Sequence, residues 1–151
     1  MLEQNLVERV LNEALKSGGE FAEVFVEDKR SSSALFDDAK VEELTSGRDR
    51  GAGIRVVAGE TTGFAHTADL SEEGLMIAAR AAASATRTDG AGSQINALEQ
   101  VVCPSPNKVE TFPELVAKGK KVNLLIQADE VARSQGAAIT QVSARYGDSR
   151  R

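Results

Sequence analysis

The stretch that most constrains the fold is residues 48–71, RDRGAGIRVVAGETTGFAHTADLS. It contains four glycines at short intervals: Gly51, Gly53, Gly59 and Gly63. The β-branched run at 54–57 is typical of a half-buried strand. Residues 58–61 are typical of a tight turn, and residues 62–66 of the strand that returns from it. Ser71 then begins a helix with two acidic residues in its first turn, where negative charge suits the helix dipole. The stretch therefore predicts a hairpin that leads directly into a helix.

Two further helices are expected. Residues 3–17 carry apolar side chains at helical spacing and end at Gly18-Gly19. Thr111 and Glu114 have the spacing of a capping box, and a helix is predicted from about residue 120 to 134. The helix that starts at Ser71 has a stripe of small apolar residues suited to close packing on a sheet: Leu75, Ala78, Ala79, Ala82 and Ala83.

Short strands are predicted at 21–27, 31–36 and 40–45, with links at Lys29-Arg30 and Asp37-Asp38, ahead of the hairpin. Links this short favour antiparallel pairing, because parallel strands need a crossover of about a dozen residues. A last strand is expected at 138–146, followed by a turn at 147–149. The predicted fold class is α+β: a mostly antiparallel meander of short strands packed against two to three helices.

The chain of 151 residues suits a single α/β domain, with a flexible connection at about 88–110 that is rich in Gly, Ser, Asn and Pro. The last strand would leave an exposed edge if nothing paired with it. We therefore expect residues 1–151 to be the N-terminal domain of a longer protein.

Composition narrows the expected partners and the compartment. The net charge is −5, aromatic residues make up 4% of the chain, and no basic stripe is present, so direct binding to nucleic acid or an anionic membrane is not expected. No stretch approaches the roughly 20 apolar residues of a membrane span. A single cysteine suits a reducing compartment, and a cytoplasmic location is expected.

No catalytic or metal-binding set is predicted in these residues. His66 is the only histidine, whereas a zinc site needs about three or four protein ligands. Cys103 has no readable base partner and is interpreted as incidental. The acidic pairs at 37–38, 42–43 and 129–130 are interpreted as solvated surface, with an ion pair from Asp129-Glu130 to Arg133.

Residues 51–65, GAGIRVVAGETTGFA, resemble the pattern G-x-G-[IV]-R-x-x-x-G-E-x-x-G-F-A of the TldD/PmbA metallopeptidase family, also called modulators of DNA gyrase. The opening helix with residues 19–26, and the alanine-rich helix after Ser71, are similar to the same N-terminal domain. The wording G-E-x-x-G-F-A is closer to the TldD side of the family than to the PmbA (TldE) side. The resemblance is strongest over residues 47–87.

The resemblance implies a zinc peptidase whose His-Glu-x-x-x-His helix and later cysteine lie in a C-terminal domain that this chain does not include. No catalytic or metal residue is therefore transferred to this chain, and zinc is expected only in the full-length protein. The longer protein is expected to degrade short or unfolded peptides, together with a TldE-like partner subunit or by self-association.

For this domain the resemblance implies a wall of the substrate chamber and part of a subunit interface. If a peptide pairs with a sheet edge here, the candidate substrate-binding residues are Gly53, Ile54, Arg55, Val56 and Val57. The alternative for Arg55 is a simple ion pair with Glu43 or Glu60. The alternative for the domain is a stand-alone or TldE-like non-catalytic binding or assembly module.

Overall fold

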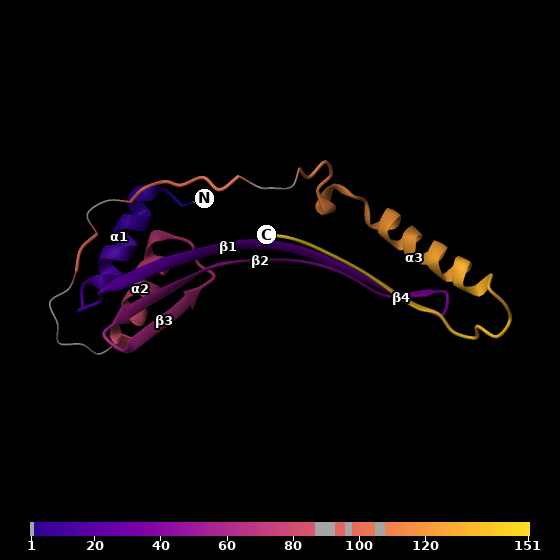
Figure 1. Cartoon of the computed structure of the whole chain (residues 1–151), viewed down its shortest axis with the longest axis horizontal. Coiled ribbons are helices and arrows are strands. Elements are labelled where there is room, and N and C mark those ends of the chain that lie inside the picture. Colours follow the sequence, from indigo (N-terminus) through magenta and orange to yellow (C-terminus); the bar gives the residue numbers. More distant parts are fainter. Residues whose placement is uncertain (1, 87–92, 96–97, 105–107) are drawn as a thin grey trace. The chain divides into compact units, whose positions relative to one another are not determined.

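A computed structural model describes residues 2–86, 93–95, 98–104 and 108–151. In this part of the chain the elements follow the order shown in Figure 1: α1 (Gln4–Leu15), β1 (Phe21–Asp37), β2 (Lys40–Ala58), β3 (Thr61–Thr67), α2 (Glu72–Thr86), the 3-10 helix η1 (Pro113–Leu115), α3 (Lys118–Arg133) and β4 (Ser143–Arg150). The strands form an antiparallel sheet in the order β3-β2-β1-β4. The predicted α+β class is confirmed.

The chain divides into two compact units, which are described separately. The first unit comprises Met1–Glu27 and Arg50–Pro104, and the second comprises Asp28–Asp49 and Ser105–Arg151. Strands β1 and β2 contribute to both units. Much of the predicted connection at 88–110 lies outside the described residues, and its described parts are neither helix nor strand.

The core of the first unit lies between one face of the sheet and two helices. Ala52, Ile54 and Val56 of β2 alternate toward this core, as a half-buried strand requires. The helices contribute their apolar stripes to it, as predicted: Val10 and Ala14 from α1, and Leu75, Ala78, Ala79 and Ala82 from α2. The predicted stripe on α2 is buried over its whole length.

Gly63 allows α2 to lie directly on β3. A Cβ atom at Gly63 would lie 1.9 Å from the carbonyl oxygen of Ala82, so no other residue fits without movement of the helix. Ser71 begins α2 as predicted, because its Oγ accepts a hydrogen bond from the backbone N–H of Gly74 at 3.2 Å.

The second unit has a smaller core under α3. Strand β4 pairs with the end of β1, from Arg30 opposite Arg150 to Asp37 opposite Ser143. Ala34 and Phe36 of β1 and Leu125 of α3 are buried together, with Ala144 and Tyr146 of β4 packed against them.

The prediction of five short strands is wrong in its segmentation. The first two form one strand of 17 residues, β1, and the third and fourth form one strand of 19 residues, β2. Lys29-Arg30 lies inside β1 and makes no turn. Polar and glycine residues weaken a local strand signal, but pairing with a neighbouring strand keeps the backbone extended.

The last strand is also displaced from its predicted position. The predicted turn at 147–149 is part of β4, where Gly147 lies opposite Ser33 and Asp148 opposite Ser32, and residues 138–142 are outside the strand. The turn at Asp37-Asp38 is confirmed within one residue, since Asp38 and Ala39 have positive φ angles of 44° and 64°. No helix in the described residues is long and apolar enough to cross a membrane.

Candidate functional site

The predicted substrate-binding residues lie on an interior strand. Residues 53–57 of β2 pair with β3, with Gly53 opposite His66 and Arg55 opposite Phe64, and β1 is the neighbour of β2 on its other side. The premise that this segment is a sheet edge is therefore wrong. Ile54 and Val56 are fully buried in the core, so Gly53, Arg55 and Val57 are the members that face away from it. A role in peptide binding stays a prediction for these residues.

Arg55 forms an ion pair, but with a partner that the sequence did not suggest. Its Nε donates a hydrogen bond to Glu23 Oε1 at 2.6 Å, and its guanidinium carbon lies 5.8 Å from the centre of the Phe21 ring. The hydrogen bond and the charge of Glu23 raise the pKa of Arg55. Glu43 and Glu60 were the expected partners, and Glu23 takes their place because β1 and β2 are neighbours.

Two exposed aromatic rings, Phe21 and Phe64, lie near Arg55 on this face of the sheet. Phe64 is 62% exposed, its ring centre lies 6.3 Å from that of His66, and its edge lies above Gly53, where a Cβ atom would be 3.1 Å away. Phe21 is half exposed. The open face therefore offers apolar contact area beside a paired arginine.

The residues of the first unit do not fit a zinc ion. His66 is exposed and stacks on Phe64, and Cys103 is exposed and free. Among the described residues, no group of three or more His, Cys, Asp or Glu side chains lies close enough together to hold a metal ion. The zinc implied by the resemblance thus has no matching donor set in these residues.

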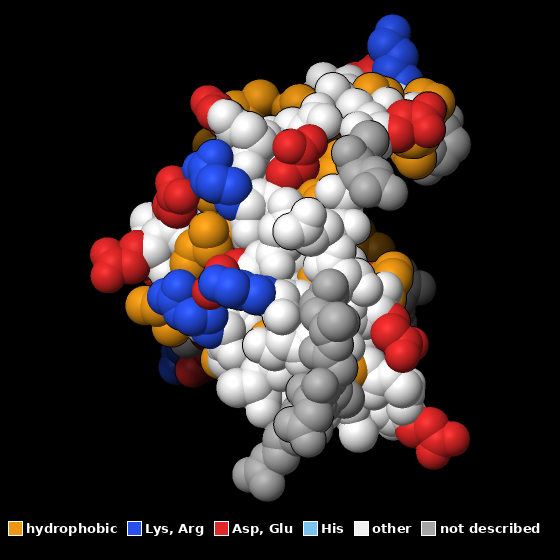
Figure 2. All heavy atoms as spheres, turned by 90° about the vertical axis from the view of Figure 1, so that its left-hand side faces the viewer, with side chains coloured by type: hydrophobic (Ala, Val, Ile, Leu, Met, Phe, Trp, Pro, Cys, Tyr) orange, Lys and Arg blue, Asp and Glu red, His pale blue; other side chains and the backbone are white. Residues whose placement is uncertain are grey.

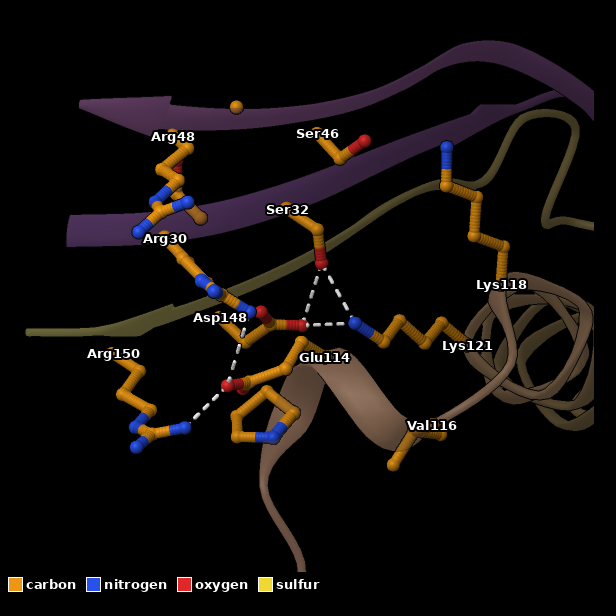
Figure 3. Close-up of a pocket in the computed structure, with 13 residues that line it drawn as sticks. Arg30, Ser32, Ser46, Arg48, Glu114, Val116, Lys118, Lys121, Asp148 and Arg150 are labelled. Atoms are coloured by element: carbon orange, nitrogen blue, oxygen red, sulfur yellow. Dashed lines mark hydrogen bonds and ion pairs between the residues drawn. The ribbon is translucent and has the colours of Figure 1, made fainter. Parts of the chain in front are cut away.

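The second unit contains a cavity of about 460 Å³, bordered by β1, β2, β4, η1 and the start of α3 (Figure 3). Its lining combines Ser31, Ser32 and Ser46 with five basic residues: Arg30, Arg48, Lys118, Lys121 and Arg150. Glu114 and Asp148 are the acidic residues of the lining. We take this cavity as the candidate binding site.

Asp148 is held at the base of this site by three partners. Its Oδ2 lies 2.7 Å from Lys121 Nζ and accepts a hydrogen bond from Ser32 Oγ at 2.7 Å, while Lys121 Nζ also lies 2.8 Å from Ser32 Oγ (Figure 3). Burial would raise the pKa of Asp148, but hydrogen bonds from Lys121, Ser32 and Tyr146 outweigh it and hold the pKa below its usual range. The hydrogen bond to Asp148, together with burial, raises the pKa of Tyr146.

Glu114 lies between two arginines at the rim. It pairs with Arg150 and lies 3.8 Å from Arg30, and the Arg150 guanidinium stacks on Phe112 at 3.8 Å. Hydrogen bonds from its own backbone and from Arg150 lower the pKa of Glu114. The predicted capping box at 111–114 is wrong, because the Glu114 carboxylate faces these arginines and η1 has no side-chain cap.

Asp129 was expected on an exposed helix face, and this is wrong. It is buried, although its predicted ion pair with Arg133 is present at 3.0 Å. Arg133 also forms an ion pair with Asp38 in the hairpin turn, at 2.8 Å.

On the face drawn in Figure 2, acidic and basic side chains lie beside one another.

Sequence reasoning missed the candidate site almost entirely. Ser31 and Ser32 were assigned only as strand residues, and Asp148 as part of a turn. The one local signal was the run of Lys118, Lys120 and Lys121 at a helix start, where acidic residues are usual.

Comparison with known proteins finds similarity to one family in both sequence and fold. Residues 22–86 match the model of the PmbA/TldA metallopeptidase domain 1. The metalloprotease TldD homolog of Haemophilus influenzae is 29% identical over 126 residues, which are 83% of this chain and 26% of that protein. The homolog of Buchnera aphidicola is 25% identical over 125 residues, with the same coverage of 83% and 26%.

Two solved structures share the fold. A protein of Bacteroides thetaiotaomicron assigned as a modulator of DNA gyrase has a TM-score of 0.71 and 18% identity, over 99% of this chain and 36% of that chain. TldE of Thermococcus kodakarensis has a TM-score of 0.62 and 16% identity, over 97% and 34%. The resemblance is confirmed by the match of residues 22–86 to domain 1 of the PmbA/TldA metallopeptidases and by the similarity to TldD homologs. The chain spans about a quarter of the length of the TldD relatives.

Proposed function

We propose that this chain is the non-catalytic first domain of a TldD-type zinc metallopeptidase that degrades short or unfolded peptides in the cytoplasm. The observation that carries the proposal is the match of residues 22–86 to the first domain of this family, together with relatives named as TldD metalloproteases. In the proposal, zinc is supplied by the remainder of the longer protein, because the donor set of these residues does not fit it.

The proposed task of the domain is to wall the substrate chamber and to contact a partner subunit, either TldE-like or a second copy. Since β2 is interior, β3 and β4 are the outer strands of the sheet and the places where an extended peptide can add a strand. The exposed rings beside Arg55 and the cavity of the second unit offer apolar and charged contacts for side chains.

The test compares the full-length gene product with the 151-residue chain. We expect about one zinc per full-length subunit by elemental analysis, and peptide hydrolysis that a chelator abolishes and added zinc restores. The 151-residue chain should contain no stoichiometric zinc and should leave the same peptides intact. Chelator-sensitive hydrolysis by the pure chain would overturn the proposed division of labour, and a full-length protein without zinc would instead indicate a TldE-like non-catalytic partner.

A further inference from the structure

The cavity of the second unit carries more positive than negative charge. Of the five basic residues in its lining, Arg48 pairs with Asp28, Lys121 with Asp148, and Arg30 and Arg150 share Glu114. Five cations thus face three carboxylates, which leaves a surplus of two positive charges. Lys118 forms no ion pair with any described residue.

The start of α3 adds to this positive field. Its first turn contains Lys118, Lys120 and Lys121 and no acidic residue, and Ala117 at the N-cap provides no side-chain hydrogen bond. The free backbone N–H groups and the helix dipole make this end of α3 electropositive. The positive charges of the lysines therefore interact unfavourably with the helix end. An anion in the adjacent cavity would relieve that repulsion.

The remaining lining is suited to oxygen atoms of an anion. Guanidinium groups bind oxyanions through paired N–H donors, and the hydroxyl group of Ser46 can donate a further hydrogen bond. The base is fixed in advance, because Lys121 is 5% exposed and is held by Asp148 and Ser32. Preorganised donors lower the entropy lost on binding.

We propose that this cavity binds a carboxylate group of the peptide substrate, either the C-terminal carboxylate or an Asp or Glu side chain. The proposal rests on the proposed function for its choice of a peptide as the source of the anion. Lys118 supplies one of the two surplus charges, and the arginines and Ser46 orient the carboxylate oxygens. The cavity then acts as a specificity site for the peptide.

The first experiment measures binding to the 151-residue chain by amide chemical-shift titration. The probes are a tetra-alanine peptide acetylated at its N-terminus with a free C-terminus, its C-terminal amide, the amide with one Glu, and inorganic phosphate. Either carboxylate peptide should shift the amides of Ser32, Ser46 and Lys118 in a saturable way, whereas the neutral amide should not. Equal binding of the neutral amide, or saturation by phosphate alone, would overturn the proposal.

Two matched variants locate the site. Lys118→Gln and Lys120→Gln remove the same charge from the same turn, but only Lys118 lines the cavity. Lys118→Gln should weaken carboxylate binding by about threefold to tenfold, and Lys120→Gln by less than about twofold. Equal effects would mean that the general field of the helix, and no defined site, attracts the peptide.

The full-length protein separates this inference from the proposed function. Lys118→Gln there should lower the ratio of kcat/KM for peptides that carry the carboxylate to kcat/KM for neutral peptides, by about threefold to tenfold. Hydrolysis without any preference for a carboxylate would overturn the inference and leave the peptidase assignment standing. Carboxylate binding by a full-length protein that lacks peptidase activity would overturn the peptidase assignment and leave the carboxylate site standing.

Discussion

Lys121 Nζ lies 2.7 Å from Asp148 Oδ2, although the two residues come from different elements and are 27 positions apart in the chain. Both side chains are largely buried, and Ser32 from a third element completes the group. A buried pair of this kind joins α3 to the strands of the second unit, and its loss would leave an uncompensated charge.

Lys121→Met should therefore destabilise the chain by about 3 kcal/mol, because Asp148 would stay buried without its cation. The matched control is Lys120→Met, which removes an exposed lysine of the same helical turn and should change stability by less than about 0.5 kcal/mol. Urea unfolding followed by circular dichroism measures both. A loss below about 1 kcal/mol for Lys121→Met would contradict the structural role of the pair.

Asp148 should make stability depend on acid pH. Its pKa is lowered in the folded state, so its contribution is present above the ordinary aspartate pKa of about 4 and is lost as the pH falls through the folded-state value. Asp148→Asn should thus be less stable than the parent chain at pH 7, and the difference should shrink below about pH 4. Melting temperatures measured from pH 7 to pH 2 check this, and a constant difference over that range would refute it.

Gly63→Ala should destabilise the first unit by at least about 2 kcal/mol, because the new methyl group would meet the Ala82 carbonyl at 1.9 Å. Gly119→Ala is the matched control, since nothing lies within 4 Å of a Cβ atom there and alanine favours the helix. It should stabilise the chain by up to about 1 kcal/mol. In denaturant unfolding, the midpoint should fall for Gly63→Ala and rise for Gly119→Ala. An unchanged midpoint for Gly63→Ala would mean that α2 does not lie on β3 as described.

The substitutions Ile54→Ala and Arg55→Gln should differ in their effect on stability, because the two side chains lie on opposite faces of β2. Ile54 is fully buried, so its truncation should cost about 3 kcal/mol. Arg55 and Glu23 form an exposed pair, and Arg55→Gln should leave the unfolding midpoint near that of the parent chain. If Arg55→Gln instead unfolds the chain, the open face is a structural surface and a weaker candidate for substrate contact.

The elements that the sequence predicted well are those with a local cause. The stripes of α1 and α2, the Ser71 cap and the hairpin of β2 and β3 depend on residues within a few positions of one another. The family pattern at 51–65 also lies in this part of the chain and was readable without a structure. These features predicted the fold class and the resemblance to the family.

The candidate site could not be predicted in the same way. Glu114 has the spacing of a helix cap, and only the arrival of Arg150 and Arg30 beside it gives the carboxylate another use. Residues 147–149 have the composition of a turn, and only the register of β4 on β1 extends them. Local propensities differ by about 1 kcal/mol at most, which pairing and burial readily exceed.

By itself, then, the amino-acid sequence determined the two helices that cover the first unit, the glycine-punctuated hairpin and the resemblance to the PmbA/TldD family. Tertiary structure alone decided that β1 and β2 run unbroken, that Arg55 pairs with Glu23, and that Lys121 meets Asp148 and Ser32 below a basic cavity. The physical reason is range: helix stripes and caps are contacts between near neighbours, whereas these pairs form only after strands distant in sequence have hydrogen-bonded in one register.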